Sequence, residues 1–167
     1  KPVALAFYSN LMTKIRVLEL AHLIQEMLPE TILIVGGPDV TYNIENYLNE
    51  GFRYVIFGEG ESTMLELYEA IELQQPVSGI QGIAYSANGT VQKNEARSNI
   101  RDLSVLPFPD RKAIPIHKYL DVWQQYHGKR TLNISTQRGC PYTCKWCSTA
   151  VYGQSYRRND PKRVVAE

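Results

Sequence analysis

The chain lacks an excess of either charge, any long apolar run, and cysteine outside one short stretch. Its 18 Lys and Arg residues balance 17 Asp and Glu residues for a net charge of +1, which gives no electrostatic case for binding nucleic acid or a membrane surface. No apolar segment approaches the roughly 20 residues of a membrane span, and we expect no signal peptide. Three cysteines in 167 residues cannot build a disulfide framework. We therefore expect a reduced, cytoplasmic protein with no membrane or nucleic-acid partner.

The three cysteines, Cys140, Cys144 and Cys147, lie within eight residues of one another with the spacing CxxxCxxC. Gly139 and Pro141 allow this loop to curl without a regular hydrogen-bond ladder, so the three thiols can turn toward one metal centre. Iron–sulfur clusters are held by cysteine thiolates, usually four of them. Three ligands on a four-iron cluster would leave one iron open, much as a catalytic zinc keeps an open position for water or substrate.

Two other interpretations of the cysteines stand beside this one. A structural zinc could take His127 as its fourth ligand, but zinc sites usually pair one CxxC unit with a second pair far along the chain. This chain has no second pair. Inert buried cysteines would be expected at scattered positions rather than in one loop beside Gly and Pro. The clustering therefore favours an iron–sulfur site with Cys140, Cys144 and Cys147 as the metal ligands.

With the aromatic Trp146 just before Cys147, the loop resembles the signature of the radical S-adenosylmethionine enzymes. The resemblance implies a [4Fe-4S] cluster whose open iron is chelated by S-adenosylmethionine, with Trp146 beside the cofactor. An electron, passed on from a donor such as flavodoxin or ferredoxin, then yields a 5′-deoxyadenosyl radical. Alternation of Leu132, Ile134 and Thr136 with polar residues predicts a strand before the loop. The resemblance makes it the first strand of the radical-enzyme barrel, with the cluster loop at its carboxyl end.

The first half of the chain alternates strand patterns with helix patterns. Short apolar runs predict strands covered on both faces, at residues 2–8, 31–35 and 53–57. Helical spacing of apolar residues follows each run, from Leu11 to Leu28, through Ile44 and Leu48, and after an expected Ser62 N-cap. This order predicts the α/β class, as a parallel, Rossmann-like sheet with covering helices in three layers.

Each of these strands is followed by a turn of mostly small or polar residues. Ligands of such sheets lie beyond the carboxyl ends of the strands, where glycine lets the backbone approach a bulky ligand. Tight strand–helix packing would explain any single glycine equally well. The turns are Ser9-Asn10-Leu11, Gly36-Gly37 and Gly58-Glu59-Gly60.

In this order the turns resemble elements of the cobalamin-binding domain that is fused ahead of radical S-adenosylmethionine barrels. The usual first element, an Asp-x-His-x-x-Gly loop, does not occur, so the lower cobalt ligand stays open. The resemblance implies that cobalamin is bound by Ser9, Leu11, Gly36, Gly37, Gly58, Glu59 and Gly60.

The middle of the chain reads as a hairpin and a connector. Asn88-Gly89 between short alternating runs predicts a β-hairpin, and Pro107 and Pro109 exclude a helix or an inner strand around them. The run Asp-x-x-x-Leu-Pro-x-Pro that starts at Asp102 also resembles the family's connector. We divide the chain into residues 1–76 as a partial cobalamin-binding domain, 77–130 as hairpin and interdomain linker, and 131–167 as the start of a radical S-adenosylmethionine partial TIM barrel.

Both ends of the chain lead us to interpret it as a piece of a longer protein. Asp160 and Pro161 predict a helix start, yet the chain stops at Glu167, and its first residue is Lys rather than Met.

The resemblance implies part of a cobalamin-dependent radical S-adenosylmethionine enzyme that acts on a small-molecule substrate. Methyl transfer to an unactivated carbon is the leading reaction, and cyclisation or rearrangement of a biosynthetic intermediate such as a tetrapyrrole is the second. One alternative is a non-catalytic Rossmann-like binding module with a structural metal loop, which metal content would distinguish. The other is a methylthiotransferase, but that family carries further cysteines in its amino-terminal domain, whereas none precedes Cys140 here.

Overall fold

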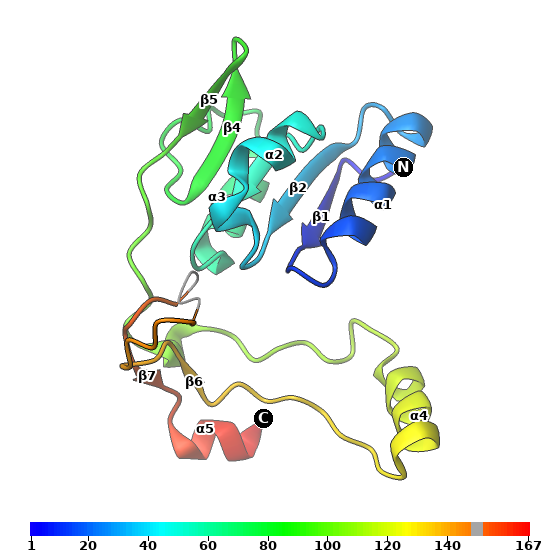
Figure 1. Cartoon of the computed structure of the whole chain (residues 1–167), viewed down its shortest axis with the longest axis vertical. Coiled ribbons are helices and arrows are strands. Elements are labelled where there is room, and N and C mark those ends of the chain that lie inside the picture. The colour runs from blue at the N-terminus through cyan, green and yellow to red at the C-terminus, as the bar shows by residue number, and fades with distance from the viewer. Residues whose placement is uncertain (148–151) are drawn as a thin grey trace. The chain divides into compact units, whose positions relative to one another are not determined.

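The computed structural model describes residues 1–147 and 152–167 (Figure 1). The chain divides into two compact units. The first consists of Lys1–Asn99 with the described part of Thr143–Gly153, and the second of Ile100–Tyr142 and Gln154–Glu167. Each unit is described by itself.

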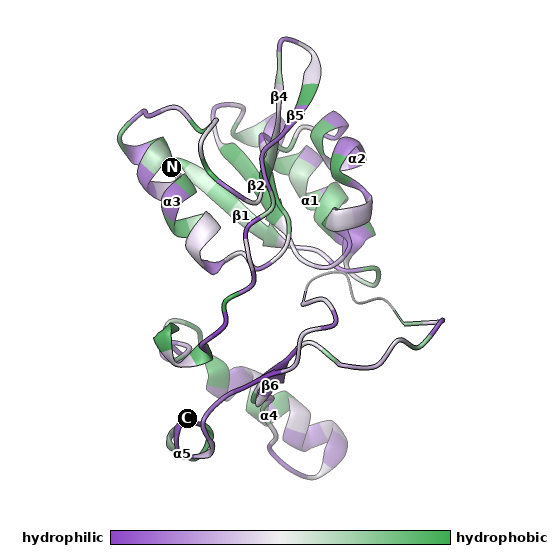
Figure 2. Cartoon of the chain, turned by 90° about the vertical axis from the view of Figure 1, so that its left-hand side faces the viewer, coloured by the Kyte–Doolittle hydropathy of each residue, from purple (hydrophilic) through white to green (hydrophobic). Residues whose placement is uncertain are grey.

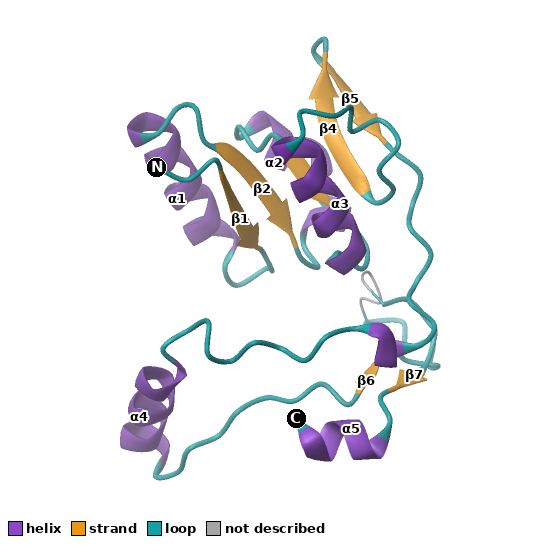
Figure 3. Cartoon of the chain, turned by 180° about the vertical axis from the view of Figure 1, so that it is seen from behind, coloured by secondary structure: helices purple, strands orange, loops and turns teal. Residues whose placement is uncertain are grey.

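The first unit is built on one sheet with the strand order β1-β2-β3-β4-β5. Figure 3 shows β1 and β2 of this sheet and the hairpin of β4 and β5. The first three strands are parallel, and β4 and β5 continue the sheet in antiparallel fashion. The strands are β1 Ala4–Tyr8, β2 Ile32–Gly36, β3 Tyr54–Ile56, β4 Ile83–Ala87 and β5 Thr90–Lys93. The helices are α1 Lys14–Met27, the short 3-10 helix η1 Val40–Tyr42, α2 Ile44–Asn49 and α3 Glu61–Glu72.

Alternating residues of the central strands serve two cores, one on each face of the sheet. Leu33 and Val35 of β2 pack with α1 and α2 on one face. Ile34, between them, packs with Ile56 and with Leu67 of α3 on the other face. Figure 2 shows the apolar strands β1 and β2 between α3 on one side and α1 and α2 on the other. The predicted α/β fold with three layers is confirmed.

The hairpin prediction is also confirmed, but the hairpin does not lie outside the sheet. Asn88 and Gly89 have φ values of 52° and 74°, as the type I′ turns favoured in hairpins require. Val55 of β3 pairs with Ala84 of β4, so residues beyond 76 extend the same sheet. Strand pairing across this distance leaves no signal in a local apolar pattern. The three-part domain division remains a prediction.

Two helix starts differ from the predicted ones. The helix α1 begins at Lys14 rather than Leu11, because the side chain of Asn10 accepts hydrogen bonds from the amides of Met12 and Thr13 at 2.9 and 3.0 Å and holds a turn there. The predicted Ser62 N-cap is wrong, since α3 begins at Glu61 behind Gly60 without a side-chain cap.

The strand β1 lies at an edge of the sheet, and within the described residues it pairs with β2 only. Exposed edges recruit other strands, and charged residues blunt them. We therefore predict that the isolated 167-residue chain self-associates in sedimentation velocity experiments, and that Ala6→Lys, at an exposed position of β1, shifts it toward monomer. Ala96→Lys adds the same charge at an exposed position outside the strands and should change nothing. Monomeric behaviour of the unmodified chain at all concentrations would contradict the prediction.

The second unit holds little regular structure. It contains the 3-10 helix η2 Leu103–Val105, α4 Ile116–His127, α5 Pro161–Ala166 and a two-stranded sheet of β6 Gln137–Arg138 and β7 Arg157–Arg158. Arginine side chains fasten its extended segments: Arg157 donates to the carbonyl of Ile100 at 2.7 Å, and Arg163 donates to the carbonyl of Leu106.

Three predictions in this unit have different outcomes. The helix start at Asp160 is confirmed, because its carboxylate accepts from the amide of Lys162 at 2.7 Å. The strand predicted at 132–136 is wrong: these residues are irregular, and Leu132 and Ile134 are 47% and 44% exposed. A strand forms only against a partner, and among the residues that the structure describes, only Gln137 and Arg138 of this segment have one, in β7. The helix α4, which ends at the left-handed Gly128, falls within the predicted linker. Among the described helices, none combines the length and the apolar character needed to cross a bilayer.

Candidate functional site

The turns after β1 and β2 meet at the carboxyl edge of the parallel strands. The amide of Ser9 donates to the carbonyl of Gly36 at 2.7 Å. A Cβ on Gly37, whose φ is 113°, would lie less than 3.0 Å from the carbonyl oxygen of Ser9. Glycine is therefore required at 37 by the contact between the two turns, independently of any ligand.

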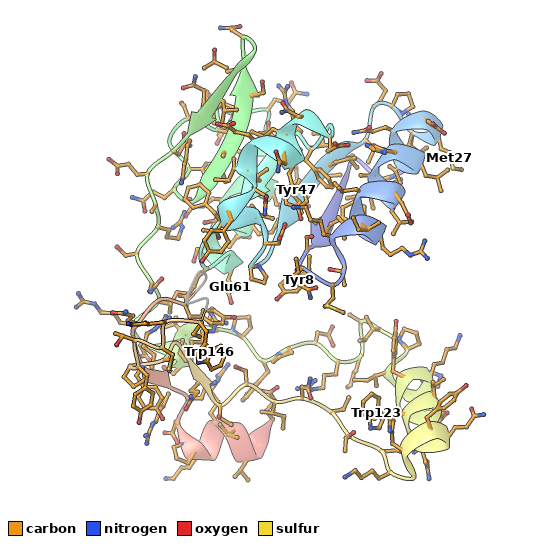
Figure 4. The ribbon with its side chains drawn as sticks, viewed as in Figure 1. Tyr8, Met27, Tyr47, Glu61, Trp123 and Trp146 are labelled. Atoms are coloured by element: carbon orange, nitrogen blue, oxygen red, sulfur yellow. The ribbon has the colours of Figure 1, made fainter. Side chains whose placement is uncertain are left out.

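The hydroxyl of Ser9 turns into the protein. Ser9 is fully buried, and its Oγ lies 2.7 Å from the hydroxyl of Tyr47 on α2; Figure 4 labels Tyr47. The Tyr47 hydroxyl donates to Asp39 Oδ2 at 2.8 Å, and Lys14 Nζ lies 3.1 Å from the same oxygen. Burial raises the pKa of Tyr47 to about 12, with Asp39 adding to the rise and the hydrogen bond from Ser9 opposing it. Tyr47 is thus a protonated phenol at neutral pH.

The other glycines of the edge have more room. A Cβ on Gly36 would meet Ile56 at 3.6 to 3.7 Å, an ordinary contact, and a Cβ on Gly58 would meet nothing within 4 Å. Gly58 has a φ of 79° and so favours glycine for its conformation. Glu59 is only 3% exposed, and Gly60 precedes the first turn of α3.

Apolar side chains are exposed beside these turns. Leu11 and Met12, in the turn after β1, are 80% and 88% exposed, and Tyr8 at the end of β1 is 68% exposed (Figure 4). A cluster of exposed apolar side chains is typical of a surface that binds a ligand or another macromolecule. Of the predicted ligand residues, Leu11 is accessible at this edge and the Ser9 side chain is not.

The cysteine loop follows β6. The three thiols are free, with Cys140 half-buried and Cys144 and Cys147 exposed. The amide of Cys147 donates to the carbonyl of Cys144 at 3.1 Å, and Trp146 is 89% exposed. In residues 1–147 and 152–167, no group of three His, Cys, Asp or Glu side chains is placed to hold a metal ion. The three-thiolate metal site therefore remains a prediction that rests on donor chemistry and spacing.

The start of this loop has a strict backbone requirement. Gly139, directly before Cys140, has a φ of 78°. A Cβ there would lie less than 3.0 Å from the carbonyl oxygen of Ser155, next to β7. The close approach of two backbones explains the glycine and fixes where the loop begins.

Sequence reasoning missed Tyr47, which bonds to the predicted Ser9, and Asp39 and Lys14, which follow Tyr47 in the same chain of polar contacts. Tyr47 reads as one more aromatic residue of an amphipathic helix, and its contact with Ser9 spans 38 positions. The one available signal was Asp39, a carboxylate two residues after Gly37 at the predicted edge.

Comparisons with known proteins give a consistent set of relatives, although no family model matches the chain. An uncharacterized methyltransferase of Pyrococcus horikoshii is 32% identical over 81% of this chain and 29% of its own length. An anaerobic magnesium-protoporphyrin IX monomethyl ester cyclase of Rubrivivax gelatinosus is 32% identical over 86% of this chain and 26% of its own length. The chain thus spans less than a third of either relative.

Solved structures share the fold. The cobalamin-dependent S-adenosylmethionine radical enzyme OxsB, with aqua-cobalamin and S-adenosylmethionine bound, matches with a TM-score of 0.81 at 20% identity, over 99% of this chain and 22% of its own. The radical S-adenosylmethionine methyltransferase TsrM of Kitasatospora setae, with cobalamin and a [4Fe-4S] cluster bound, matches with a TM-score of 0.74 at 19% identity, over 100% of this chain and 35% of its own.

Proposed function

We propose that this chain is part of a cobalamin-dependent radical S-adenosylmethionine enzyme, and that it carries part of the cobalamin site and the cluster loop of that larger enzyme. The observation that carries the proposal is the meeting of the Ser9 and Gly36-Gly37 turns at the carboxyl edge of parallel strands, beside exposed Leu11. That edge is where ligands of open α/β sheets bind.

The residues present fit cobalamin in two respects. The backbone at Gly36 and Gly58 carries no side chain, and there is room beside both positions. Leu11, in the turn after the neighbouring strand β1, offers exposed apolar surface, and ligand sites are lined mostly by apolar side chains. In this proposal Ser9, Leu11, Gly36, Gly37, Gly58, Glu59 and Gly60 form the part of the site that this chain contributes.

The cysteine loop fits an iron–sulfur cluster by its donor set. Cys140, Cys144 and Cys147 supply three thiolates, one fewer than the usual four, and Trp146 is available beside them for S-adenosylmethionine. When bound, the cluster supplies the electron that cleaves S-adenosylmethionine. For the whole protein we infer a cytoplasmic setting and reduction by a flavodoxin or ferredoxin.

For the reaction of the whole protein we infer methyl transfer to a carbon atom of a small molecule, with cyclisation as the second candidate. The relatives support both, since they include a hopanoid C-3 methylase of Methylococcus capsulatus and several anaerobic cyclases.

The test of the cobalamin site is Gly36→Val in the full-length protein. The added side chain projects from backbone that the ligand must approach, so we expect cobalamin affinity in equilibrium dialysis to fall by about tenfold or more, with little change in melting temperature. Gly36 is suited to this test because its Cβ would make only ordinary contacts, whereas a side chain at Gly37 would disturb Ser9 in the free protein.

The matched control is Gly79→Val, at a glycine of the same unit where an added Cβ meets nothing within 4 Å. It should bind cobalamin like the unmodified protein. A full-length protein that binds no cobalamin would overturn the proposed function, and equal affinity of Gly36→Val would remove the β2 turn from the site.

A further inference from the structure

A chain of polar side chains runs beneath the ligand edge of the first unit. We call Lys14, Asp39, Tyr47 and Ser9 the Tyr47 network. Its members come from four places: the first residue of α1, the loop after β2, the middle of α2 and the turn after β1. Successive members are joined at 3.1, 2.8 and 2.7 Å. The Tyr47 and Ser9 side chains are completely buried.

The hydrogen atoms in this network have a defined direction. Asp39 Oδ2 lies 3.1 Å from Lys14 Nζ and accepts from the Asn43 side-chain amide at 3.2 Å, so this oxygen is an acceptor in the network. Tyr47 has one hydroxyl hydrogen and gives it to Asp39. Ser9 must therefore donate its own hydroxyl hydrogen to Tyr47. The Ser9 hydroxyl has no hydrogen left for a ligand, so its part in the site lies in its backbone.

The backbone of Ser9 is the point where the two turns meet. Its amide is bonded to Gly36, and its carbonyl lies against Gly37. Asp39 belongs to the second of these turns, two residues beyond Gly37. Tyr47 thus ties a side chain from each turn to one phenol oxygen. Any buried phenol needs hydrogen-bond partners, but here both partners come from the turns that form the proposed ligand edge.

We propose that Tyr47 is a positioning residue for the cobalamin edge, holding the Ser9 turn and the Gly36–Asp39 turn in their binding conformation before the ligand arrives. This inference rests on the proposed function. A preformed site avoids the cost of ordering its loops when the ligand binds. Tyr47 itself makes no contact with the ligand, so its effect on binding passes through the two turns.

The test is Tyr47→Phe in the full-length protein, which keeps the ring and removes only the hydroxyl. We expect cobalamin affinity to fall by about tenfold at a temperature where the variant is fully folded. We also expect faster hydrogen exchange at the Ser9 amide, since the turns are then tied together by fewer bonds. The matched control is Tyr68→Phe on α3, where the side chain is 54% exposed and loss of the hydroxyl should leave both quantities unchanged.

A second variant keeps the inference testable if Tyr47→Phe does not fold. Ser9→Ala removes the other end of the same hydrogen bond and should weaken cobalamin binding similarly. The double variant should bind cobalamin no more weakly than the single variant with the lower affinity, because both changes remove the same hydrogen bond.

The outcomes separate the two proposals. A full-length protein without cobalamin affinity overturns the proposed function, and the positioning role falls with it. A protein that binds cobalamin equally well with and without the Tyr47 hydroxyl, with unchanged exchange at Ser9, overturns the positioning role alone. Additive losses in the double variant would also contradict it.

Discussion

Replacing Cys140, Cys144 or Cys147 by alanine in the full-length protein should abolish the iron–sulfur cluster. Anaerobic reconstitution of the unmodified protein with iron and sulfide should give about four irons per cluster site and a broad visible absorption. Each variant should lose both signals, because this chain has three cysteines and none to spare. Iron and sulfide analysis beside absorption spectra measures the effect.

The control is Tyr142→Ala, which changes an exposed side chain of the same loop that is not one of the predicted thiolate ligands. It should retain the full iron content. Stoichiometric zinc without sulfide in the unmodified protein would contradict the prediction and would favour a structural metal loop. That result would leave the sheet and its ligand edge unaffected, since these are built from other residues.

The parallel part of the fold could be predicted because its signals are local. The β2 residues Leu33, Ile34 and Val35 are all apolar since both faces of that strand are covered. Asn88 and Gly89 predict their hairpin because few other residues accept two successive positive φ values. In each case the residues themselves carry the structural requirement.

Features that depend on a partner could not be predicted in the same way. The alternation at Leu132 and Ile134 is typical of a strand, but within the described residues they have no neighbouring strand to pair with. The pairing of β4 with β3 could not be predicted either, because the apolar pattern of the hairpin does not indicate which strand it pairs with.

The candidate site divides along the same line. The sequence located the glycines at 36, 37 and 58 by their place at the ends of predicted strands. It did not reveal why each position holds glycine. Gly37 is required because a side chain there would clash with the backbone of Ser9, whereas a side chain at Gly36 would make only ordinary contacts. Only the three-dimensional structure shows that the Ser9 hydroxyl is hydrogen-bonded to Tyr47. The sequence motif therefore located the ligand edge, and the buried contacts of the structure indicate which of its residues can face a ligand.

The glycine before the first cysteine provides the second prediction with a large effect. Gly139→Ala places a Cβ less than 3.0 Å from the Ser155 carbonyl oxygen, in a residue with a φ of 78°. Because the Cβ is attached rigidly to the backbone of residue 139 and the oxygen belongs to the backbone of Ser155, the clash can be relieved only by separating the segments around β6 and β7. We expect Cys140 to be displaced and the reconstituted iron content of the full-length protein to fall to a small fraction of its normal value.

The matched control is Gly153→Ala, which has the same conformational strain without the clash. Gly153 has a φ of 61°, and its nearest neighbour, the Asn99 side chain, would lie 3.7 Å from the new Cβ. An alanine in the left-handed conformation lowers the stability of the fold by about 1 to 2 kcal/mol. This variant should therefore have a slightly lower melting temperature and still assemble its cluster. The contrast isolates the close approach of the two backbones from the cost of the φ angle. Equal iron content in Gly139→Ala and Gly153→Ala would show that the contact at Ser155 does not hold the cysteine loop in place.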